Sequence, residues 1–388
     1  NVLHLNRSLE NEAAERGEAD VVSFIARVDA MRATLMQARN PRTQPAVDDK
    51  VLTSWNAMMI GAMAMGFRVT GETRYLESAI RAADFIEHAL TDGERLLRTY
   101  RDDHAHLSGY LEDYAHMGEA LIDLYEASGE GRFLTRATML LETMIRDFGE
   151  PGGAFYTTAS NHETLILRKR EGYDGATPSP NAVAACALTR LAAHMGRDDF
   201  HQEALGAIEA WGHAVMEMPR AFSKLLHAVD FILEGPTQIA ITGRQDADAT
   251  NSLERAVLTS FTPNAVIARE HPVRDDAQPL DAHPLLSERS GIEEHRVHIC
   301  RDFTCRTPET TTSGVLNALR SSTSLARSTT LRRPISGKAT PESTRRRSEQ
   351  SFAAEALKTL GDTGLTVTPV SFGAYRIIDE VETHQQAL

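Results

Sequence analysis

Carboxylate, amide and aromatic residues gather in three short segments, and their chemistry suits a polar ligand. The segments are Asp48-Asp49-Lys50 with Trp55-Asn56, Glu112-Asp113-Tyr114, and Asp174-Gly175 with Ser179-Pro180-Asn181. Carboxylates accept hydrogen bonds from paired hydroxyl groups, and indole or phenol rings stack on sugar C–H surfaces. The combination is therefore typical of a site for a polyhydroxylated ligand.

The same residue types are also common at the ends of helices. Ser54, Asp113 and Ser179 stand at plausible helix N-cap positions, and Pro180 stands at a favoured first helical position. Capping does not explain Trp55, the paired acids Asp48 and Asp49, or the Glu112-Asp113-Tyr114 triplet. The sequence therefore leaves two interpretations open for these residues, a helix cap and a ligand site.

A repeated glycine–aromatic–alanine pattern indicates the elements that must position these residues. The aromatic residue follows the glycine by four positions and the alanine follows by eight. The three copies are Gly71/Tyr75/Ala79, Gly129/Phe133/Ala137 and Gly196/Phe200/Ala204. Each glycine stands where a helix C-cap is expected, and the other two residues then share one face of the next helix. A spacing of roughly 60 residues with two helices in each unit predicts a tandem array of helical hairpins.

The two helices of each hairpin differ in polarity. The first helices are apolar around most of their circumference, as helices buried on nearly all sides are, whereas the second helices are amphipathic. The expected ranges are 54–69, 114–127 and 180–195 for the first helices and 73–90, 132–147 and 198–217 for the second. An earlier helical segment at 11–39 supplies one more hairpin or a long helix. Inner apolar helices that alternate with outer amphipathic helices predict a mainly α, (α/α) toroid. The three polar clusters then lie at one rim of this toroid.

Composition divides the chain into four parts. Residues 1–235 are predicted to form a partial toroid, because a closed six-hairpin toroid needs more helices, and the missing helices are expected before Asn1. Residues 236–305 read as strand, helix and strand, which predicts a small α/β appendage. Residues 306–350 are rich in Ser, Thr and Arg with few large apolar residues, so a disordered linker is expected. Residues 351–388 become foldable again.

Two connecting segments, 94–111 and 152–171, alternate apolar and polar residues, and each predicts a short β-hairpin at the rim. Arg98 and Arg168 on these hairpins suit the binding of a carboxylate or phosphate group. Ion pairs with the rim acids, or a solvated strand face, are equally open.

Charged residues also follow the second inner helix. His116, Glu119 and Asp123 form a stripe that faces either the toroid lumen or water. No metal and no cofactor are expected, because Cys300 and Cys305 lack a second cysteine pair and the histidines lack a regular ligand spacing. The two cysteines form a local disulfide or remain thiols.

Composition and charge restrict the partners of the chain. A formal net charge of −13 argues against binding nucleic acid or an anionic membrane, since both require a basic surface. The longest apolar run, at 57–67, is too short to cross a membrane. No basic-then-apolar signal segment opens the sequence, and three cysteines do not make a disulfide framework, so a cytoplasmic location is expected.

Three long motifs resemble one known family. RNPRTQPAVDDKVLTSWNAMMI, GYLEDYAHMGEALIDLYEASG and REGYDGATPSPNAVAACAL are similar to the helical region of the spermatogenesis-associated protein 20 family, over about residues 1–310. The resemblance implies a thioredoxin-like domain, missing from this chain, followed by a six-hairpin glycosidase-like toroid similar to sugar epimerases. It implies no established reaction.

The positions that match the family's motifs coincide with the three polar clusters. We expect four acids to be catalytic: Asp49, Glu112, Asp113 and Asp174. We expect the remaining polar and aromatic positions, together with Arg168 beside the rim, to bind the ligand: Asp48, Lys50, Trp55, Asn56, Tyr114, Arg168, Ser179 and Asn181. The chain departs from the family pattern at Ala57 and Pro180, where glycine is usual, and Pro180 removes a backbone donor that would otherwise be able to face a ligand.

The last residues resemble a second family. TLGDTGLTVTPVSFGAYRI is similar to the opening of aldo/keto reductases, which begin a (β/α)₈ barrel. The reductases' catalytic residues would lie beyond Leu388, so the match assigns no reductase activity.

The leading hypothesis is a carbohydrate-active or carbohydrate-binding toroid with a sugar as its small-molecule ligand. Glycoside hydrolysis requires one acid to protonate the leaving oxygen and a second group to activate water or attack carbon. Epimerisation requires a base to remove a proton from carbon, for which His116 is the candidate. The alternative hypotheses are a non-catalytic interaction module that serves a thioredoxin-like domain, and a nonfunctional truncated fusion.

Overall fold

The computed structural model divides the chain into two compact units, Asn1–Lys50 and Val51–Leu388. The structure describes residues 7–150, 153–163, 166–243, 249–274, 276–287, 289, 291, 294–301, 304–322, 358–359 and 366–367. A boundary between the two units thus falls within the range 1–235 that was predicted for the toroid, and the predicted domain bounds stay a prediction. None of the described helices is both long and apolar enough to span a membrane.

The first unit contains two helices, α1 (Leu9–Glu15) and α2 (Val21–Arg39), in the segment 11–39 that was predicted to form one more hairpin or a long helix. Both begin at side-chain caps. Ser8 accepts a hydrogen bond from the backbone N–H of Asn11, and Asp20 accepts bonds from the backbone N–H groups of Val22 and Ser23. These caps satisfy donors that the first helical turn leaves without partners.

The second unit is built from helical hairpins, as predicted. The hairpins are α3 (Thr53–Thr70) with α4 (Thr73–Ala89), α5 (Leu111–Ser128) with α6 (Gly131–Phe148), and α7 (Pro180–Met195) with α8 (Asp198–Glu209). Gly71, Gly129 and Gly196 end the first helix of each hairpin with φ values of 77°, 77° and 64°, in the left-handed region that glycine favours. The predicted glycine register is confirmed.

The third outer helix is shorter than predicted. The range 198–217 contains two helices, α8 and α9 (Gly212–Glu217), with a break at Ala210 and Trp211. A 3₁₀ turn at Pro219–Phe222 then leads into α10 (Ser223–Glu234), which packs against α7 as the next inner helix.

The layers of the array follow the polarity of the helices. Most residues of α5 and α7 are buried, whereas α4 and α6 bury only one face. Helix α3 departs from the expectation of an inner helix buried on nearly all sides. Within the second unit its side chains Trp55, Met59, Met65 and Val69 are 46–62% exposed. The predicted class, a mainly α and incomplete (α/α) toroid, is confirmed.

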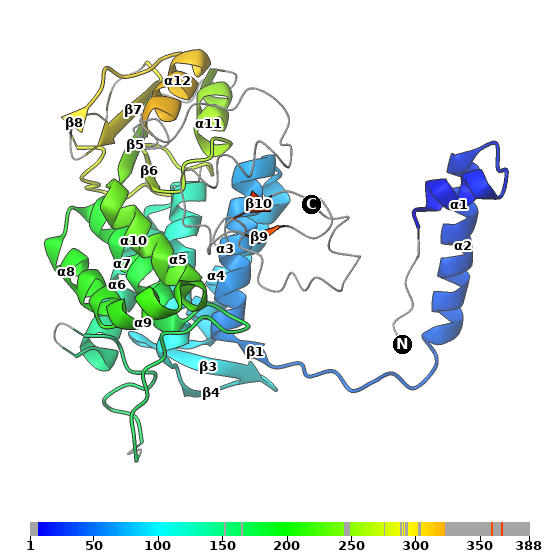
Figure 1. Ribbon diagram of the computed structural model, residues 1–388, viewed down its shortest axis with the longest axis horizontal. Coiled ribbons are helices and arrows are strands. Elements are labelled where there is room, and N and C mark those ends of the chain that lie inside the picture. Colours follow the sequence, from blue (N-terminus) through cyan, green and yellow to red (C-terminus); the bar gives the residue numbers. More distant parts are fainter. Residues whose placement is uncertain are drawn as a thin grey trace. The chain divides into compact units, whose positions relative to one another are not determined.

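A small sheet closes one end of the helical array (Figure 1). It contains β1 (Val51–Leu52), β2 (Thr91–Asp92), β3 (Arg95–Arg101) and β4 (His104–Ser108). Asp102 and Asp103, both with positive φ, form the tight turn between β3 and β4, which confirms the first predicted hairpin. The second predicted hairpin is wrong as a ladder, because the described residues of 152–171 form only an isolated bridge between Tyr156 and Arg170.

The appendage lies at the opposite end of the helices (Figure 1). Strands β5 (Thr237–Thr242) and β6 (Ala265–Arg269) are parallel and are joined through α11 (Ala249–Leu258), as the strand–helix–strand prediction requires. Strand β7 (Arg296–Arg301) pairs antiparallel with β5, and β8 (Thr304–Cys305) pairs with β7. Cys300 and Cys305 form a disulfide between these last two strands.

The predicted linker begins too early. Residues Thr312–Ser322 form α12, which packs against α11 and β7 through Val315, Ala318 and Leu319. The rest of the predicted linker, 323–350, lies outside the described residues. In the reductase-like segment, the structure describes the short antiparallel pair of β9 (Lys358–Thr359) and β10 (Thr366–Val367).

Candidate functional site

The rim acid Asp113 is fully buried and binds the start of two inner helices. One carboxylate oxygen accepts a hydrogen bond from the backbone N–H of Tyr110 (2.8 Å), the N-cap of α5, and the other accepts from the backbone N–H of Ser54 (3.0 Å) in α3. Arg98 lies 3.3 Å from the same carboxylate. Burial raises the pKa of Asp113 to about 6, although the backbone donor of Tyr110 and the charge of Arg98 act in the opposite direction.

Asp174 makes an equivalent connection in the next part of the array. Its carboxylate accepts hydrogen bonds from the backbone N–H of Ser179 (2.9 Å), the N-cap of α7, and from that of Lys224 (2.8 Å) in the first turn of α10. Each of these two acids therefore joins the N-terminal ends of two adjacent inner helices.

The capping assignments are only partly correct. Ser179 caps α7 by accepting from Ala182 N–H (3.4 Å), and Pro180 follows at the first helical position, as predicted. Ser54 lies within the first turn of α3, whose N-cap is Leu52, so its predicted role as a cap is wrong. Asp113 is the third residue of α5 and completes a capping box with Tyr110, rather than being the N-cap itself.

Three further predicted ligand-binding side chains form hydrogen bonds with the protein backbone. Asn181 is fully buried and binds both backbone groups of Phe155, at 2.7 Å and 3.0 Å, as well as the carbonyl of Glu171. The buried Tyr114 hydroxyl accepts a bond from Leu96 N–H (3.0 Å). Asn56 donates to the Leu52 carbonyl (2.9 Å). These contacts fix the rim loops to the inner helices.

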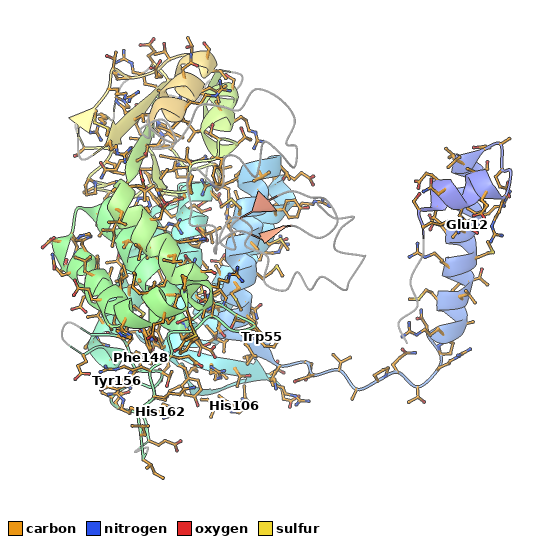
Figure 2. All side chains as sticks on the ribbon, viewed as in Figure 1. Glu12, Trp55, His106, Phe148, Tyr156 and His162 are labelled. Atoms are coloured by element: carbon orange, nitrogen blue, oxygen red, sulfur yellow. A yellow bond between two sulfur atoms is a disulfide. The ribbon has the colours of Figure 1, made fainter. Side chains whose placement is uncertain are left out.

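Other predicted residues lie at the same end of the helices. Trp55 is 62% exposed and is seen there with Tyr156 and His162 (Figure 2). Arg168 donates to the Thr158 carbonyl (2.6 Å) and stacks on the Tyr156 ring. The structure thus brings the second and third predicted clusters to one rim.

A cavity of about 230 Å³ opens at this rim between the starts of α5 and α7. It is lined by Tyr110, Leu111, Glu112, Thr157, Thr158, Lys169, Glu171 and Pro180. Of the four predicted catalytic acids, only Glu112 lines it, and Glu112 also forms an ion pair with Arg98 (2.5 Å). The predicted cluster at Asp48, Asp49 and Lys50 ends the first unit, where Lys50 pairs with Asp48 (2.9 Å), so its role at the rim stays a prediction.

A larger cavity of about 510 Å³ occupies the toroid lumen. Its wall contains charged residues from the four inner helices α3, α5, α7 and α10: Arg68, Glu119, Asp123, Glu126, Arg190, Lys224 and Asp230. The stripe of acids on α5 therefore faces the lumen, one of the two positions left open by the sequence.

The lumen charges are arranged in close pairs. Lys224 lies 2.6 Å from Glu119, and Arg190 lies 2.7 Å from Asp123. Glu126, only 1% exposed, contacts Arg68, Arg190 and His194 at 3.0–3.1 Å. Burial by itself would raise the pKa of Glu126, but these neighbours, above all Arg190, outweigh it and hold the pKa at about 2.

For two nearby side chains, burial outweighs the neighbouring charges and determines the direction of the pKa shift. It raises the pKa of Asp123, despite the charge of Arg190, and it lowers the pKa of His116 below its usual value. The lumen therefore combines a carboxylate that is ionised near neutral pH, Glu126, with a carboxyl that holds its proton more readily, Asp123. Such differences between neighbouring titratable groups are common at catalytic sites.

Sequence reasoning missed most of the lumen. It identified Glu119 and Asp123 but not Glu126, although Glu126 continues the same stripe three residues later. Arg190 carried a weak signal, since it interrupts the otherwise apolar run of α7. Among the described residues, no group of three or more His, Cys, Asp or Glu side chains is arranged to hold a metal ion.

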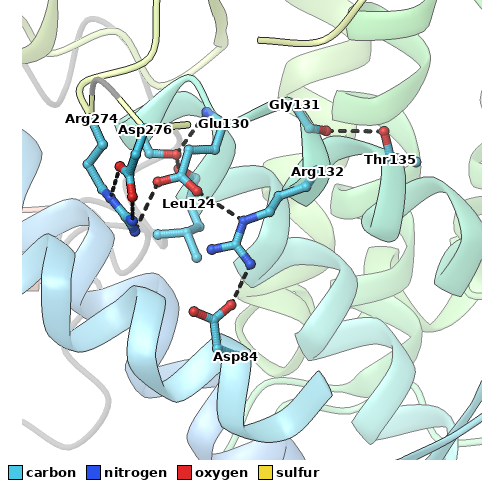
Figure 3. A network of polar contacts seen from close by, with 9 residues as sticks. Asp84, Leu124, Glu130, Gly131, Arg132, Thr135, Arg274 and Asp276 are labelled. Atoms are coloured by element: carbon cyan, nitrogen blue, oxygen red, sulfur yellow. Dashed lines mark hydrogen bonds and ion pairs between the residues drawn. The ribbon is translucent and has the colours of Figure 1, made fainter. Parts of the chain in front are cut away.

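A third cavity, of about 560 Å³, lies where the appendage meets the start of α6. Four charged side chains that line it form ion pairs: Arg132 with Glu130 and with Asp84 of α4, and Arg274 with Glu130 and Asp276 (Figure 3). Gly131 donates its backbone N–H to the Gln278 carbonyl (2.9 Å), and this bond ties the appendage to the toroid. The contacts describe a structural junction.

Two layers of helices around a charged lumen define an incomplete (α/α) toroid, the class predicted from the sequence. The chain is 31% identical to human spermatogenesis-associated protein 20 over 327 residues, and 30% identical to the mouse protein over the same length. The resemblance to that family is thus confirmed over 80% of this chain, which spans 41% of the length of these relatives. No family model matches the sequence.

Solved structures provide a second comparison. A cellobiose 2-epimerase from Spirochaeta thermophila is 18% identical with a TM-score of 0.36, covering 42% of this chain and 43% of the epimerase. An unsaturated glucuronyl hydrolase from Bacillus sp. GL1 is 15% identical with a TM-score of 0.34, covering 43% of this chain and 48% of the hydrolase.

Proposed function

We propose that the toroid binds a sugar in its lumen and acts on it with the acids of α5. The observation that carries this proposal is the concave 510 Å³ cavity, into which one helix presents Glu119, Asp123 and Glu126 opposite basic side chains. Paired carboxylates and cations offer acceptors and donors to neighbouring hydroxyl groups, which is the requirement of a polyhydroxylated ligand.

The charge balance of the lumen favours an uncharged sugar. Four carboxyl groups (Glu119, Asp123, Glu126 and Asp230) and three cations (Arg68, Arg190 and Lys224) line the cavity, so its net charge is −1 when all four are ionised and zero when Asp123 holds its proton. A uronate would add a further negative charge to this wall and would have to displace an acid from its cation. A neutral sugar exchanges hydrogen bonds with the pairs and leaves them intact.

The proposed roles follow from the protonation states. Asp123 is the candidate general acid, because burial raises its pKa and so favours the protonated form that can donate to a leaving oxygen. Glu119 is the candidate carboxylate partner, since residues four apart on a helix lie on one face with Cβ atoms about 5–6 Å apart. For epimerisation, His116 on the same helix is the candidate base, because burial lowers its pKa and favours the neutral imidazole, although His116 is not among the residues that line the cavity.

The rim acids receive different roles in this proposal. Glu112, predicted from the sequence to be catalytic, lines the smaller rim cavity, and we propose that it binds a ligand there. Asp113 and Asp174 use their carboxylates to hold helix N-termini, so we propose that they position the inner helices and do not act on the sugar.

The test is binding and turnover of a panel of neutral, acidic and N-acetylated sugars. Hydrolysis is followed by release of reducing ends, and epimerisation by exchange of the sugar C–H with deuterated water. We expect neutral sugars to bind, Asp123→Asn to abolish turnover, and Glu112→Gln to retain it. Absence of binding by every sugar would refute the proposal, and loss of activity in Glu112→Gln with full activity in Asp123→Asn would move the site to the rim.

The apolar stripe on α3 favours one alternative, a non-catalytic module that binds a thioredoxin-like domain. Trp55, Met59 and Met65 are exposed along this helix, and large exposed apolar side chains in a row are typical of a protein contact. The alternative predicts that a purified thioredoxin-like domain binds the chain and that Met59→Ser weakens the complex. The sugar proposal predicts no effect of Met59→Ser on sugar binding.

A further inference from the structure

The appendage contributes one wall of the lumen cavity. Its loop between α11 and β6 lines the cavity with Phe261, Thr262, Pro263 and Asn264, opposite side chains of α7 and α10. The cavity is therefore lined by both the toroid and the appendage.

Phe261 is the unusual residue in this wall because its side chain is 81% exposed. Other phenylalanines of the helical core, such as Phe148, Phe200 and Phe222, are at most 1% exposed. Full burial of a phenylalanine stabilises a fold by roughly 2–3 kcal/mol, and the largely exposed Phe261 provides little of this stabilisation. A single exposed phenylalanine on a convex surface needs no explanation, but this one stands at a charged concave site.

The loop that carries Phe261 is held in place. Asn264 donates a side-chain hydrogen bond to Asp230 of α10 (2.7 Å), and its carbonyl accepts from Thr237 N–H (2.8 Å). Arg255 of α11 donates to the carbonyls of Arg68 and Val69 at the end of α3 (2.9 and 2.8 Å). The loop is thus fixed to both sides of the lumen.

The cavity wall also contains polar atoms without partners. The Thr262 hydroxyl oxygen and the Arg68 Nε are buried, and neither has a hydrogen-bond partner among the residues that the structure describes. Both residues line the cavity. Buried polar atoms are normally satisfied, but these two are covered by the wall itself, so a ligand in the cavity would reach them only if the wall rearranged.

We propose that Phe261 is the stacking platform of the sugar site and that it selects a cyclic sugar over a linear polyol. The apolar C–H face of a pyranose ring packs on the phenyl ring, while the hydroxyl groups at the ring edge reach the charged pairs of α5 and α7. A linear polyol offers the same hydroxyl groups but no rigid C–H face. This inference rests on the proposed sugar function and deepens it.

The test compares the affinities of methyl β-glucoside and sorbitol for the full chain by isothermal titration calorimetry. We expect the glucoside to bind more tightly than sorbitol, and Phe261→Ala to weaken glucoside binding roughly tenfold with little change for sorbitol. Phe261→Tyr should restore glucoside binding, because it restores the ring. The matched control is Phe85→Ala, since Phe85 is a half-exposed phenylalanine of α4 that packs on Tyr100 away from the lumen.

The outcomes separate the two proposals. If the wild-type chain binds the glucoside and Phe261→Ala binds it equally well, the platform is refuted and the sugar function stands. If the wild-type chain binds neither compound nor any other pyranoside, both proposals fail. If Phe85→Ala weakened glucoside binding as much as Phe261→Ala does, or if Phe261→Ala alone lowered the Tm, the loss of binding would arise from a change in the fold. Either result would refute the platform.

Discussion

Replacing Glu126 by glutamine tests the charged lumen most directly. The substitution keeps the shape of the side chain but removes the charge that faces Arg68, Arg190 and His194. The pKa of Glu126 is lowered from 4.5 to about 2 in the folded chain. At ~1.4 kcal/mol per pKa unit this corresponds to ~3 kcal/mol, similar to the cost of removing one partner from a buried ion pair.

The pH dependence of this loss gives a sharper test than its size. A carboxylate whose pKa is depressed by folding stabilises the fold fully above its unfolded pKa, and this stabilisation disappears as the pH falls through the folded pKa. The difference between wild type and Glu126→Gln should therefore be ~3 kcal/mol at pH 7, narrow below pH 4.5 and fall to ~1.5 kcal/mol near pH 3. Groups that do not interact with Glu126 affect both proteins equally, whereas the pKa values of Asp123 and His194, which Glu126 raises, are lower in the variant.

The assay is urea unfolding followed by circular dichroism at a series of pH values. The matched control is Glu142→Gln, which removes the carboxylate from the exposed pair with Arg197 and should cost at most ~1 kcal/mol. A Glu126→Gln protein within ~0.5 kcal/mol of wild type at pH 7 would refute the reasoning. A difference that stays constant between pH 7 and pH 3 would do so too, because the effect would then arise from packing.

Two further predictions concern the rim and the junction with the appendage. Burial raises the pKa of Asp113 to about 6, so ionisation of this carboxyl lowers the free energy of unfolding by ~3 kcal/mol as the pH rises from about 4 to 6. Asp113→Asn should abolish this part of the difference between the free energies of unfolding measured at pH 4 and at pH 7. Gly131→Ala places a Cβ 2.4 Å from the Leu280 backbone nitrogen, so it should lower the stability by ~1–3 kcal/mol in thermal unfolding. The control is Gly212→Ala, whose Cβ meets open space and should not lower the stability. Equal Tm values for the two variants would contradict this prediction.

The helical hairpins were predictable because their signals are local. A glycine at a left-handed C-cap and apolar residues with helical spacing lie within a few turns of each other, so Gly129 and Phe133 identify their hairpin without knowledge of distant contacts. The alternating pattern at 152–171 is just as local, but a distant residue overrides it. Asn181 binds both backbone groups of Phe155, so a side chain takes the place of a neighbouring strand there.

The predicted linker failed for a related reason. Composition averages over the whole Ser/Thr/Arg-rich segment and hides Val315, Ala318 and Leu319, whose spacing places them on one helix face. Their burial depends on α11 and the sheet of the appendage, which composition does not report. Tertiary contacts thus decide whether this short apolar stripe folds.

The candidate site was harder to predict because the same residue types suit both capping and ligand binding. Asp113 has the sequence context of a catalytic acid, yet its oxygens accept from Ser54 and Tyr110 backbone groups. The lumen was missed because its pairs join residues far apart in the chain, such as Arg190 with Asp123. Sequence spacing shows which residues share one face of a helix, but it does not show which residues of another helix lie across from that face.

The rim acids and the lumen acids form one arrangement along the inner helices. Asp113 fixes the start of α5 against α3, and Asp174 fixes the start of α7 against α10. A helix that is held at its first turn has a defined rotation about its axis and a defined position along it. The residues two to four turns later therefore face defined neighbours. Glu119, Glu126 and their partners on α3, α7 and α10 meet at such positions. A rim acid can therefore influence the arrangement of the lumen side chains without touching a ligand, because it sets the register of the helices that carry them.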